Sequence, residues 1–254
     1  MVRLAAAQSI SSPGDLAANV ASHLRFIQEA QQAGVDLLVF PELSLSGYEP
    51  DLLAGCLVDA GAPDGVLAPL QSAVDAAGMA VVVGGPVAHA AGGLPHIAAI
   101  LIAPQASPRI CLKQHLHPGE EAFASPGTEG AFLIDTAGLR TGLAVCADFC
   151  TASHAARAHE AGAQIYVASA LISLGGYGHD AALLQARART HGMPVLLSNH
   201  GGSSGGYVSA GRSAFWLPDG SLLAEVDGPG EQLLVIDRRE LGAGWFARVL
   251  SMQR

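Results

Sequence analysis

The stretch Ala144–Cys150, with the sequence AVCADFC, decides how the rest of this chain is interpreted. A short apolar run ends at Cys146, and one small residue separates this cysteine from Asp148. An apolar run of this kind is typical of a buried strand. The pattern therefore predicts a strand that delivers a thiol to the end of a sheet, where the chain turns into a helix.

Two other apolar runs also end on a chemically useful residue. The run LLVFPE brings Glu42 to a strand end, and the run RICLK brings Lys113 to another. A cysteine attacks a carbonyl only as its thiolate, so it needs a base or a positive field nearby. Glu42 would be that base in a dry site, because burial raises a carboxyl pKa toward neutrality. Lys113 and the backbone N–H of Ala147 would stabilise the resulting oxyanion.

Each of these residues also has an ordinary structural interpretation. A buried cysteine is more often a small hydrophobic residue than a nucleophile. Glutamate and lysine at strand ends are usually solvated. The three residues therefore form a hypothesis of an acyl-transfer site, which the flanking residues must support.

Composition favours one globular domain over residues 1–254. Half of the 254 residues are hydrophobic and 14% are charged, which is enough to bury a substantial core. The formal net charge of -9 offers no basic face to phosphates, so no nucleic-acid partner is expected. No apolar run approaches the roughly 18 residues of a membrane span, so no membrane partner is expected either.

The N-terminus and the cysteines predict a cytoplasmic protein. The opening residues MVRLAAAQS lack the apolar segment of a secretory signal. The four cysteines, Cys56, Cys111, Cys146 and Cys150, are scattered through a chain too long to need disulfides, which favours a reducing compartment. Cys146 and Cys150 have no histidine pair at metal-ligand spacing nearby. We therefore predict neither a metal site nor a cofactor.

Apolar periodicity predicts an α/β fold. Helices are expected over residues 15–33, 63–77, 153–161 and 180–191. Strands are expected over 2–7, 35–40, 80–83, 96–103, 108–113, 131–135, 139–146, 164–168, 194–198, 213–217, 222–226 and 233–236. Strand pairs mixed with strand–helix steps favour two mixed sheets packed on each other with helices outside.

The flanking residues supply the missing support. Three segments, FPELSLSGY, LKQHLHPGEEAFASPG and GLAVCAD, resemble the motif regions of the nitrilase superfamily, the carbon–nitrogen hydrolases, and occur in the family's order. The start AAAQ and the closing segments SNHGG, GRSAFWLPDGSLLAEVDG and LLVIDR resemble the same family. The resemblance therefore covers nearly the whole chain.

This resemblance implies a four-layer α-β-β-α sandwich and a triad of Glu42, Lys113 and Cys146. It also implies a second glutamate that positions substrate, which falls on Glu120, with Glu121 as the other candidate. Members of the family commonly dimerise through helices beside the cysteine strand, so a homodimer or higher homo-oligomer is expected.

The chain departs from the family after its cysteine. The residues Phe149–His154 lack the Pro-Glu that often follows Cys-x-Asp and helps to shape the pocket. Branches that act on carbamoyl amino acids tend to place an arginine shortly after the cysteine, and here the first is Arg157, inside a predicted helix. Cys150 is interpreted as structural, with a redox partnership to Cys146 as the alternative.

The residues of the pocket rim are predicted from their neighbourhood. Tyr48 lies in the glutamate motif, and the loop that contains Tyr177 and His179 follows a strand beyond the cysteine strand. A purely structural loop is an equally good interpretation of this segment.

The resemblance, together with the three candidate residues, implies cysteine-dependent hydrolysis of a small linear amide to acid and ammonia through a thioester. The substrate partner would be a small amide or a nitrile. A nitrilase or an N-carbamoyl amidohydrolase with the same triad remains an alternative. A non-catalytic binding protein that retains the fold is a further one, although the intact triad argues against it.

Overall fold

The computed structural model describes residues 1–62, 64–128, 130–238 and 244–252. Within these residues the strands form two sheets. The first sheet contains, in spatial order, β13 (Trp245–Ser251), β12 (Gln232–Arg238), β1 (Val2–Gln8), β2 (Leu37–Val39), β3 (Ala80–Val87), β4 (His96–Ile102) and β5 (Arg109–Leu112). The second contains β11 (Leu222–Glu225), β10 (Ala214–Trp216), β9 (Val195–Asn199), β8 (Ile165–Ala170), β7 (Leu139–Val145) and β6 (Phe132–Thr136).

Both sheets are mixed. In the first, β1, β2 and β3 are parallel and their neighbours pair antiparallel. In the second, β7, β8 and β9 are parallel and the outer pairs are antiparallel. The expected α/β fold with two mixed sheets is therefore confirmed.

The two-residue period of the strands sorts their side chains into layers. Leu4 and Ala6 of β1 join a core that also contains Val145 of β7, so these faces of the two sheets pack on each other. Ala5 and Ala7 point the other way, into a core shared with α1 (Leu16–Gln32) and α2 (Ala68–Ala77). The outer face of the second sheet packs in the same manner on α3 (Ala152–Glu160) and α4 (Tyr177–His191).

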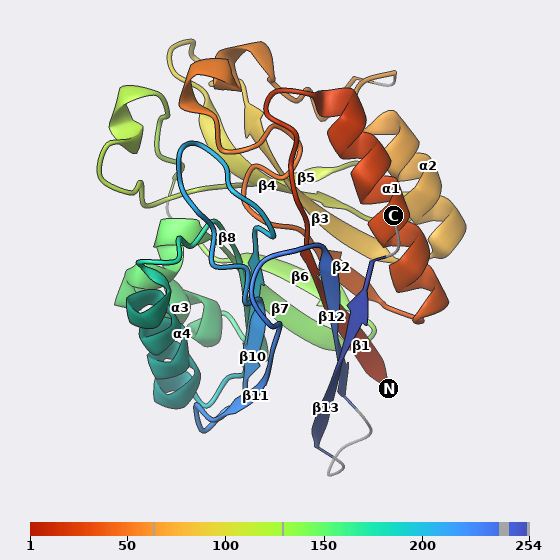
Figure 1. The fold of residues 1–254 in the computed structure, drawn as a ribbon, viewed down its shortest axis with the longest axis vertical. Coiled ribbons are helices and arrows are strands. Elements are labelled where there is room, and N and C mark those ends of the chain that lie inside the picture. The colour runs from red at the N-terminus through yellow and green to blue at the C-terminus, as the bar shows by residue number, and fades with distance from the viewer. Residues whose placement is uncertain (63, 129, 239–243, 253–254) are drawn as a thin grey trace.

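The result is an α-β-β-α sandwich. Figure 1 shows α1 and α2 on one side of the molecule and α3 and α4 on the other, with the strands between them. No helix in the described part of the chain is long and apolar enough to cross a membrane.

Local signals explain where most elements begin and end. Asp15 caps α1 by accepting a hydrogen bond from the Ala18 N–H at 3.0 Å, as its position before the apolar periodicity predicts. The expected helix from residue 63 begins later, at Ala68, and Pro63 lies outside the described residues. The last helix begins at Tyr177, earlier than predicted. The prediction missed its first turn because that turn contains glycine, a poor helix former.

Two strand predictions need correction. Strand β3 does not stop before Gly84, but continues to Val87, because its glycines allow a close approach of another backbone rather than a turn. The C-terminal strand β13 was not predicted at all. It is an edge strand with both faces partly exposed, so its sequence WFARVLS shows no clean alternation of polar and apolar residues.

The carboxyl ends of the parallel strands meet at one end of the sandwich. Hydrogen bonds between the sheets fix this end. The Ser198 hydroxyl contacts the carbonyls of Ala7 and Val39 at 3.0 and 2.9 Å, and the Ser169 hydroxyl donates to the Phe40 carbonyl at 2.8 Å. Residues that directly follow β2 and β7 are therefore held close together.

Candidate active site

Cys146 lies at the junction between β7 and a short 3-10 helix, η3 (Cys146–Cys150). Its backbone has φ of +44°, a left-handed conformation that is unfavourable for a residue with a side chain. Because of this sharp turn, the Cys146 side chain leaves the line of strand β7 and lies in a pocket. The Cys146 Sγ atom lies 3.8 Å from the Leu171 carbonyl oxygen, after the adjacent strand β8.

Asp148 maintains this turn and explains the Cys-x-Asp spacing. Its side chain is fully buried and accepts a hydrogen bond from the Val145 N–H at 3.1 Å, directly before the cysteine. Its other oxygen accepts from the backbone N–H groups of Gln114 and His115 at 3.0 and 2.8 Å. One carboxylate therefore connects the cysteine turn to the segment that carries Lys113.

Glu42 is positioned by a second tight turn, after β2. The backbone of this turn crosses β3 so closely that a Cβ atom on Gly84 would lie 2.3 Å from the Leu43 nitrogen. Only glycine fits there. On the other side, the buried His200 contacts the Glu42 carbonyl oxygen through Nε2 at 2.6 Å. Burial lowers the pKa of His200 to about 4, so the ring is neutral and donates this hydrogen bond.

Lys113 joins two carboxylates beneath the pocket. Its Nζ atom lies 2.7 Å from Glu42 Oε1 and 2.6 Å from Glu120 Oε1, and all three side chains are buried. Glu120 is held in turn by the Tyr48 hydroxyl at 2.6 Å and by the His117 N–H at 2.7 Å. We call Glu42, Lys113 and Glu120 the closed wall of the pocket.

The electrostatics of the closed wall suit proton transfer. Burial raises the pKa of Glu42, and the Lys113 ammonium opposes this rise. Burial and the negative charge of Glu42 raise the pKa of Cys146, which favours the protonated thiol. The two carboxylates hold the pKa of Lys113 well above its usual range, so it stays charged. Glu42 Oε2 is buried without a hydrogen-bond partner in the described part of the chain, and the carboxylate lines the pocket.

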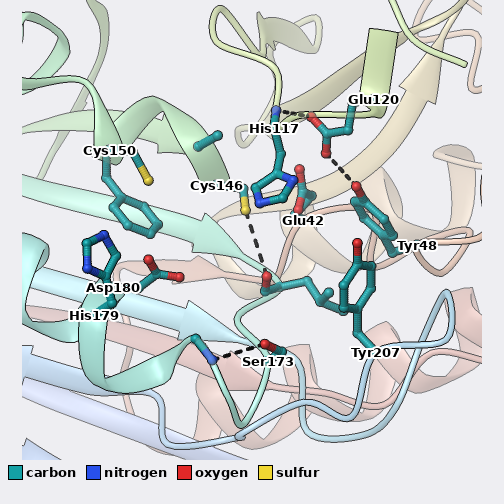
Figure 2. Close-up of a pocket in the computed structure, with 14 residues that line it drawn as sticks. Glu42, Tyr48, His117, Glu120, Cys146, Cys150, Ser173, His179, Asp180 and Tyr207 are labelled. Carbon is teal, nitrogen blue, oxygen red and sulfur yellow. Dashed lines mark hydrogen bonds between the residues drawn. The ribbon is translucent and has the colours of Figure 1, made fainter. Parts of the chain in front are cut away.

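The pocket in front of these residues has a volume of about 360 Å³. Figure 2 shows Cys146 near its centre, with Glu42, Glu120 and Tyr48 on one side. Ala147 also lines it, and its N–H belongs to the first turn of η3, where N–H groups lack an acceptor within the helix. The opposite side carries Cys150, His179 and Asp180, which we call the open wall.

The structure brings together most of the residues predicted from the sequence. Glu42, Glu120, Cys146 and Ala147 line the pocket, with Lys113 bonded to both glutamates behind it. The predicted rim residues Tyr48 and His179 also line it.

Tyr177 is a correction to the predicted rim. Its side chain is buried, and its hydroxyl donates to Glu225 Oε2 at 2.6 Å, on the side of α4 away from the pocket lining. The helix begins at Tyr177, so its period turns this residue toward the sheet and leaves His179 on the pocket side.

The structure also describes the surroundings of Glu120, Glu121, His115 and Cys150. Glu120 is buried against Lys113, whereas Glu121 is exposed and accepts a hydrogen bond from the Gly119 N–H at 2.8 Å. His115 contacts Asp148 through Nδ1 at 3.0 Å. Cys150 is a free, exposed cysteine at the edge of the pocket.

Several residues of the site were not predicted from the sequence. Gly84 and His200 position Glu42, while Tyr207 and Asp180 line the pocket. The contacts of these four residues join segments that are distant in the sequence, so no local pattern pointed to them.

Comparison with known families agrees with this geometry. The family model described as carbon-nitrogen hydrolase matches residues 3–243. The chain therefore belongs to the carbon–nitrogen hydrolase family, and it is a hydrolase of the amidase/nitrilase type.

Two curated relatives are similar over most of the chain. One, from Pseudomonas protegens, is described as the hydrolase in the pqqF 5' region; it is 32% identical over 249 residues, covering 95% of this chain and 85% of the relative. The other is an (R)-stereoselective amidase from Pseudomonas sp., 30% identical over 218 residues, covering 84% of this chain and 76% of the relative.

Solved structures of an amidase from Nesterenkonia sp. AN1 share the fold. The NitN amidase superposes with a TM-score of 0.85 at 27% identity, covering 94% of each chain. A variant that shows the Michael addition of acrylamide at its active site cysteine gives a TM-score of 0.84 at 26% identity, again over 94% of each chain.

Proposed function

We propose that the protein hydrolyses small linear amides to the carboxylic acid and ammonia, with Cys146 as the nucleophile. The observation that carries this proposal is the buried Lys113 ammonium, held between Glu42 and Glu120 beside the cysteine turn. A charge cluster without solvent is costly, and it is most useful where a negative charge must be stabilised during a reaction.

The first half of the reaction forms a thioester. Glu42 takes the thiol proton as Cys146 Sγ attacks the amide carbonyl carbon, and the carbonyl oxygen becomes an oxyanion. Lys113 and the Ala147 N–H stabilise this oxyanion. Collapse of the intermediate breaks the C–N bond, and the proton on Glu42 passes to the leaving nitrogen, which departs as ammonia.

The second half returns the free enzyme. Glu42 takes a proton from water, and the hydroxide attacks the thioester carbonyl. The C–S bond breaks, the carboxylic acid leaves, and Cys146 regains its proton. The raised pKa of Glu42 suits it to accept and return a proton in both halves.

An amide is favoured over the two alternative substrates. A structural neighbour, the amidase from Nesterenkonia sp. AN1, has been solved in complex with butyramide. A carbamoyl amino acid would need a cation for its carboxylate, and none of the described residues that line the pocket is arginine or lysine. Arg157 instead donates to Gln114 Oε1 at 3.1 Å from α3.

We further propose that residues 1–254 act as one carbon–nitrogen hydrolase domain, supported by a family match that begins at residue 3 and ends at 243. A homo-oligomer and a cytoplasmic location stay predictions from the sequence.

The test is ammonia release from a panel of aliphatic amides, dicarboxylic acid monoamides, nitriles and N-carbamoyl amino acids. The native protein and Cys146→Ala are compared, with Cys150→Ser as a control that alters the other cysteine of the pocket. Amide turnover that disappears only in Cys146→Ala supports the proposal, and mass spectrometry should then detect an acyl group on Cys146.

Other results would redirect or reject the proposal. Carbon dioxide released together with ammonia would identify a carbamoyl substrate, and turnover restricted to nitriles would identify a nitrilase. Turnover that survives in Cys146→Ala would rule out Cys146 as the nucleophile.

A further inference from the structure

The open wall contains a carboxylate that the proposed reaction does not use. Asp180 lies in the first turn of α4, is half-buried and lines the pocket. A Cβ atom on Gly176 would lie 3.7 Å from Asp180 Oδ2, so the carboxylate lies next to the backbone of a residue that has no side chain. In Figure 2 Asp180 lies on the other side of Cys146 from Glu120 and Tyr48.

The side-chain carboxylate of Asp180 has no hydrogen-bond or ion-pair partner among the described residues, unlike that of Asp148 nearby. Asp148 is buried and accepts four hydrogen bonds, which account for its place in the fold. Asp180 neither caps α4 nor joins the helix to a neighbour. Burial raises the pKa of Asp180, while His179 and His117 oppose the rise, so a further cation would stabilise the carboxylate.

The charge balance of the pocket points in the same direction. Lys113 is already shared by Glu42 and Glu120. Of the described lining residues, only the histidines His117 and His179 could add positive charge. The pocket therefore has an excess of carboxylates, and the whole chain carries a net charge of -9. Both properties attract cations and repel anions.

We propose that Asp180 binds a protonated amine on the acyl chain of the substrate, so that the protein prefers small amino amides. This inference rests on the proposed amide hydrolysis and adds the chemical class of the substrate. The amide would lie at Cys146, and the ammonium group would lie at the open wall, where it pairs with Asp180. A pocket of about 360 Å³ accommodates an acyl chain of a few carbon atoms between the two.

Matched substrate pairs test the proposal. β-Alaninamide, γ-aminobutyramide and δ-aminovaleramide are each compared with the amide in which a methyl group replaces the ammonium group: butyramide, valeramide and hexanamide. We expect kcat/KM to favour the amino amide by about tenfold or more in the pair whose length spans Cys146 to Asp180. Succinamic acid, which carries a carboxylate, should be the poorest substrate.

Charge removal tests the residue itself. Asp180→Asn keeps the shape of the side chain, and it should reduce the amino-to-alkyl ratio of kcat/KM at least fivefold. Asp64→Asn removes an exposed carboxylate outside the pocket and should leave this ratio within twofold of the native value. Equal kcat/KM for both members of every pair, or an unchanged ratio in Asp180→Asn, would overturn the proposal.

Failure of the proposed amidase activity would be distinguishable. In that case neither member of any pair would be consumed in a Cys146-dependent manner. Calorimetric titration of Cys146→Ala with the same pairs would then decide the inference. Tighter binding of the amino amide, lost in the Cys146→Ala/Asp180→Asn protein, would support it, and equal binding of both members would reject it.

Discussion

The two walls of the pocket differ in how completely their charges are paired. In the closed wall, Glu42, Lys113 and Glu120 are buried and bonded to one another at 2.6–2.7 Å. In the open wall, the Asp180 carboxylate has no hydrogen-bond or ion-pair partner among the described residues, and Cys150 and His179 are exposed.

This difference separates two tasks. A fully paired and buried wall is preorganised, so it can stabilise charge as soon as the reaction creates it. A partly solvated wall with an unpaired carboxylate can still bind a cationic group of a ligand. We infer that the closed wall carries the chemistry and that the open wall selects the substrate.

The largest effect is expected from breaking the closed wall at its centre. Lys113→Met leaves Glu42 and Glu120 buried together without their cation. One of them must then take up a proton, and the oxyanion loses its main stabilising charge. We expect kcat for an amide substrate to fall by at least about a thousandfold.

Arg109→Met is the matched control. It removes an exposed cation from β5, the strand that Lys113 directly follows, where Arg109 lies 4.6 Å above the Phe132 ring. Its kcat should stay near the native value. Circular dichroism should show that both variants fold, and a Lys113→Met protein with native kcat would contradict the role of the closed wall.

An intermediate effect is expected on acid stability, because neutral histidines support the closed wall. His23 is buried, stacks on Phe40 with ring centroids 4.0 Å apart and contacts Ser44 Oγ at 3.0 Å, next to the Glu42 turn. Burial lowers its pKa from 6.5 to about 4, as it does for His200. The unfolded chain therefore binds protons between these values that the folded chain does not.

Stability should consequently be complete above pH 6.5 and should decline as the pH falls toward 4, by about 3 kcal/mol for each histidine. Urea unfolding at several pH values measures this decline. In His23→Asn the slope of unfolding free energy against pH should be smaller over this range by about 1 kcal/mol per pH unit. Identical slopes in the two proteins would show that His23 is not buried in its neutral form.

The smallest effect is expected at the open wall, from Cys150→Ser. Cys150 is exposed and follows the cysteine turn, where its backbone carbonyl rather than its thiol is held by Arg187 at 2.8 Å. The substitution should change kcat/KM for an alkyl amide by less than about threefold, since surface substitutions usually have small effects. A loss as large as that of Lys113→Met would assign Cys150 to the reaction.

The sequence alone predicted the class of fold, which the structure confirms, and the three residues of the proposed triad. The apolar runs that end on Glu42, Lys113 and Cys146 are local patterns, because each predicted strand and the reactive residue that follows it are adjacent in the sequence. The apolar run that contains Leu4 and Ala7 likewise predicted a strand, and the structure places its alternate side chains in two different cores.

The tertiary structure alone decided what surrounds the triad. The close crossing at Gly84 and the hydrogen bond from His200 join segments distant in the sequence, and no local pattern encodes such contacts. The exclusion of Tyr177 from the rim and the presence of Asp180 depended on where α4 begins, and its glycine-containing first turn obscured that point. Hydrophobic periodicity therefore specified which residues could react, while packing between distant segments decided which charges are paired and which remain available to a substrate.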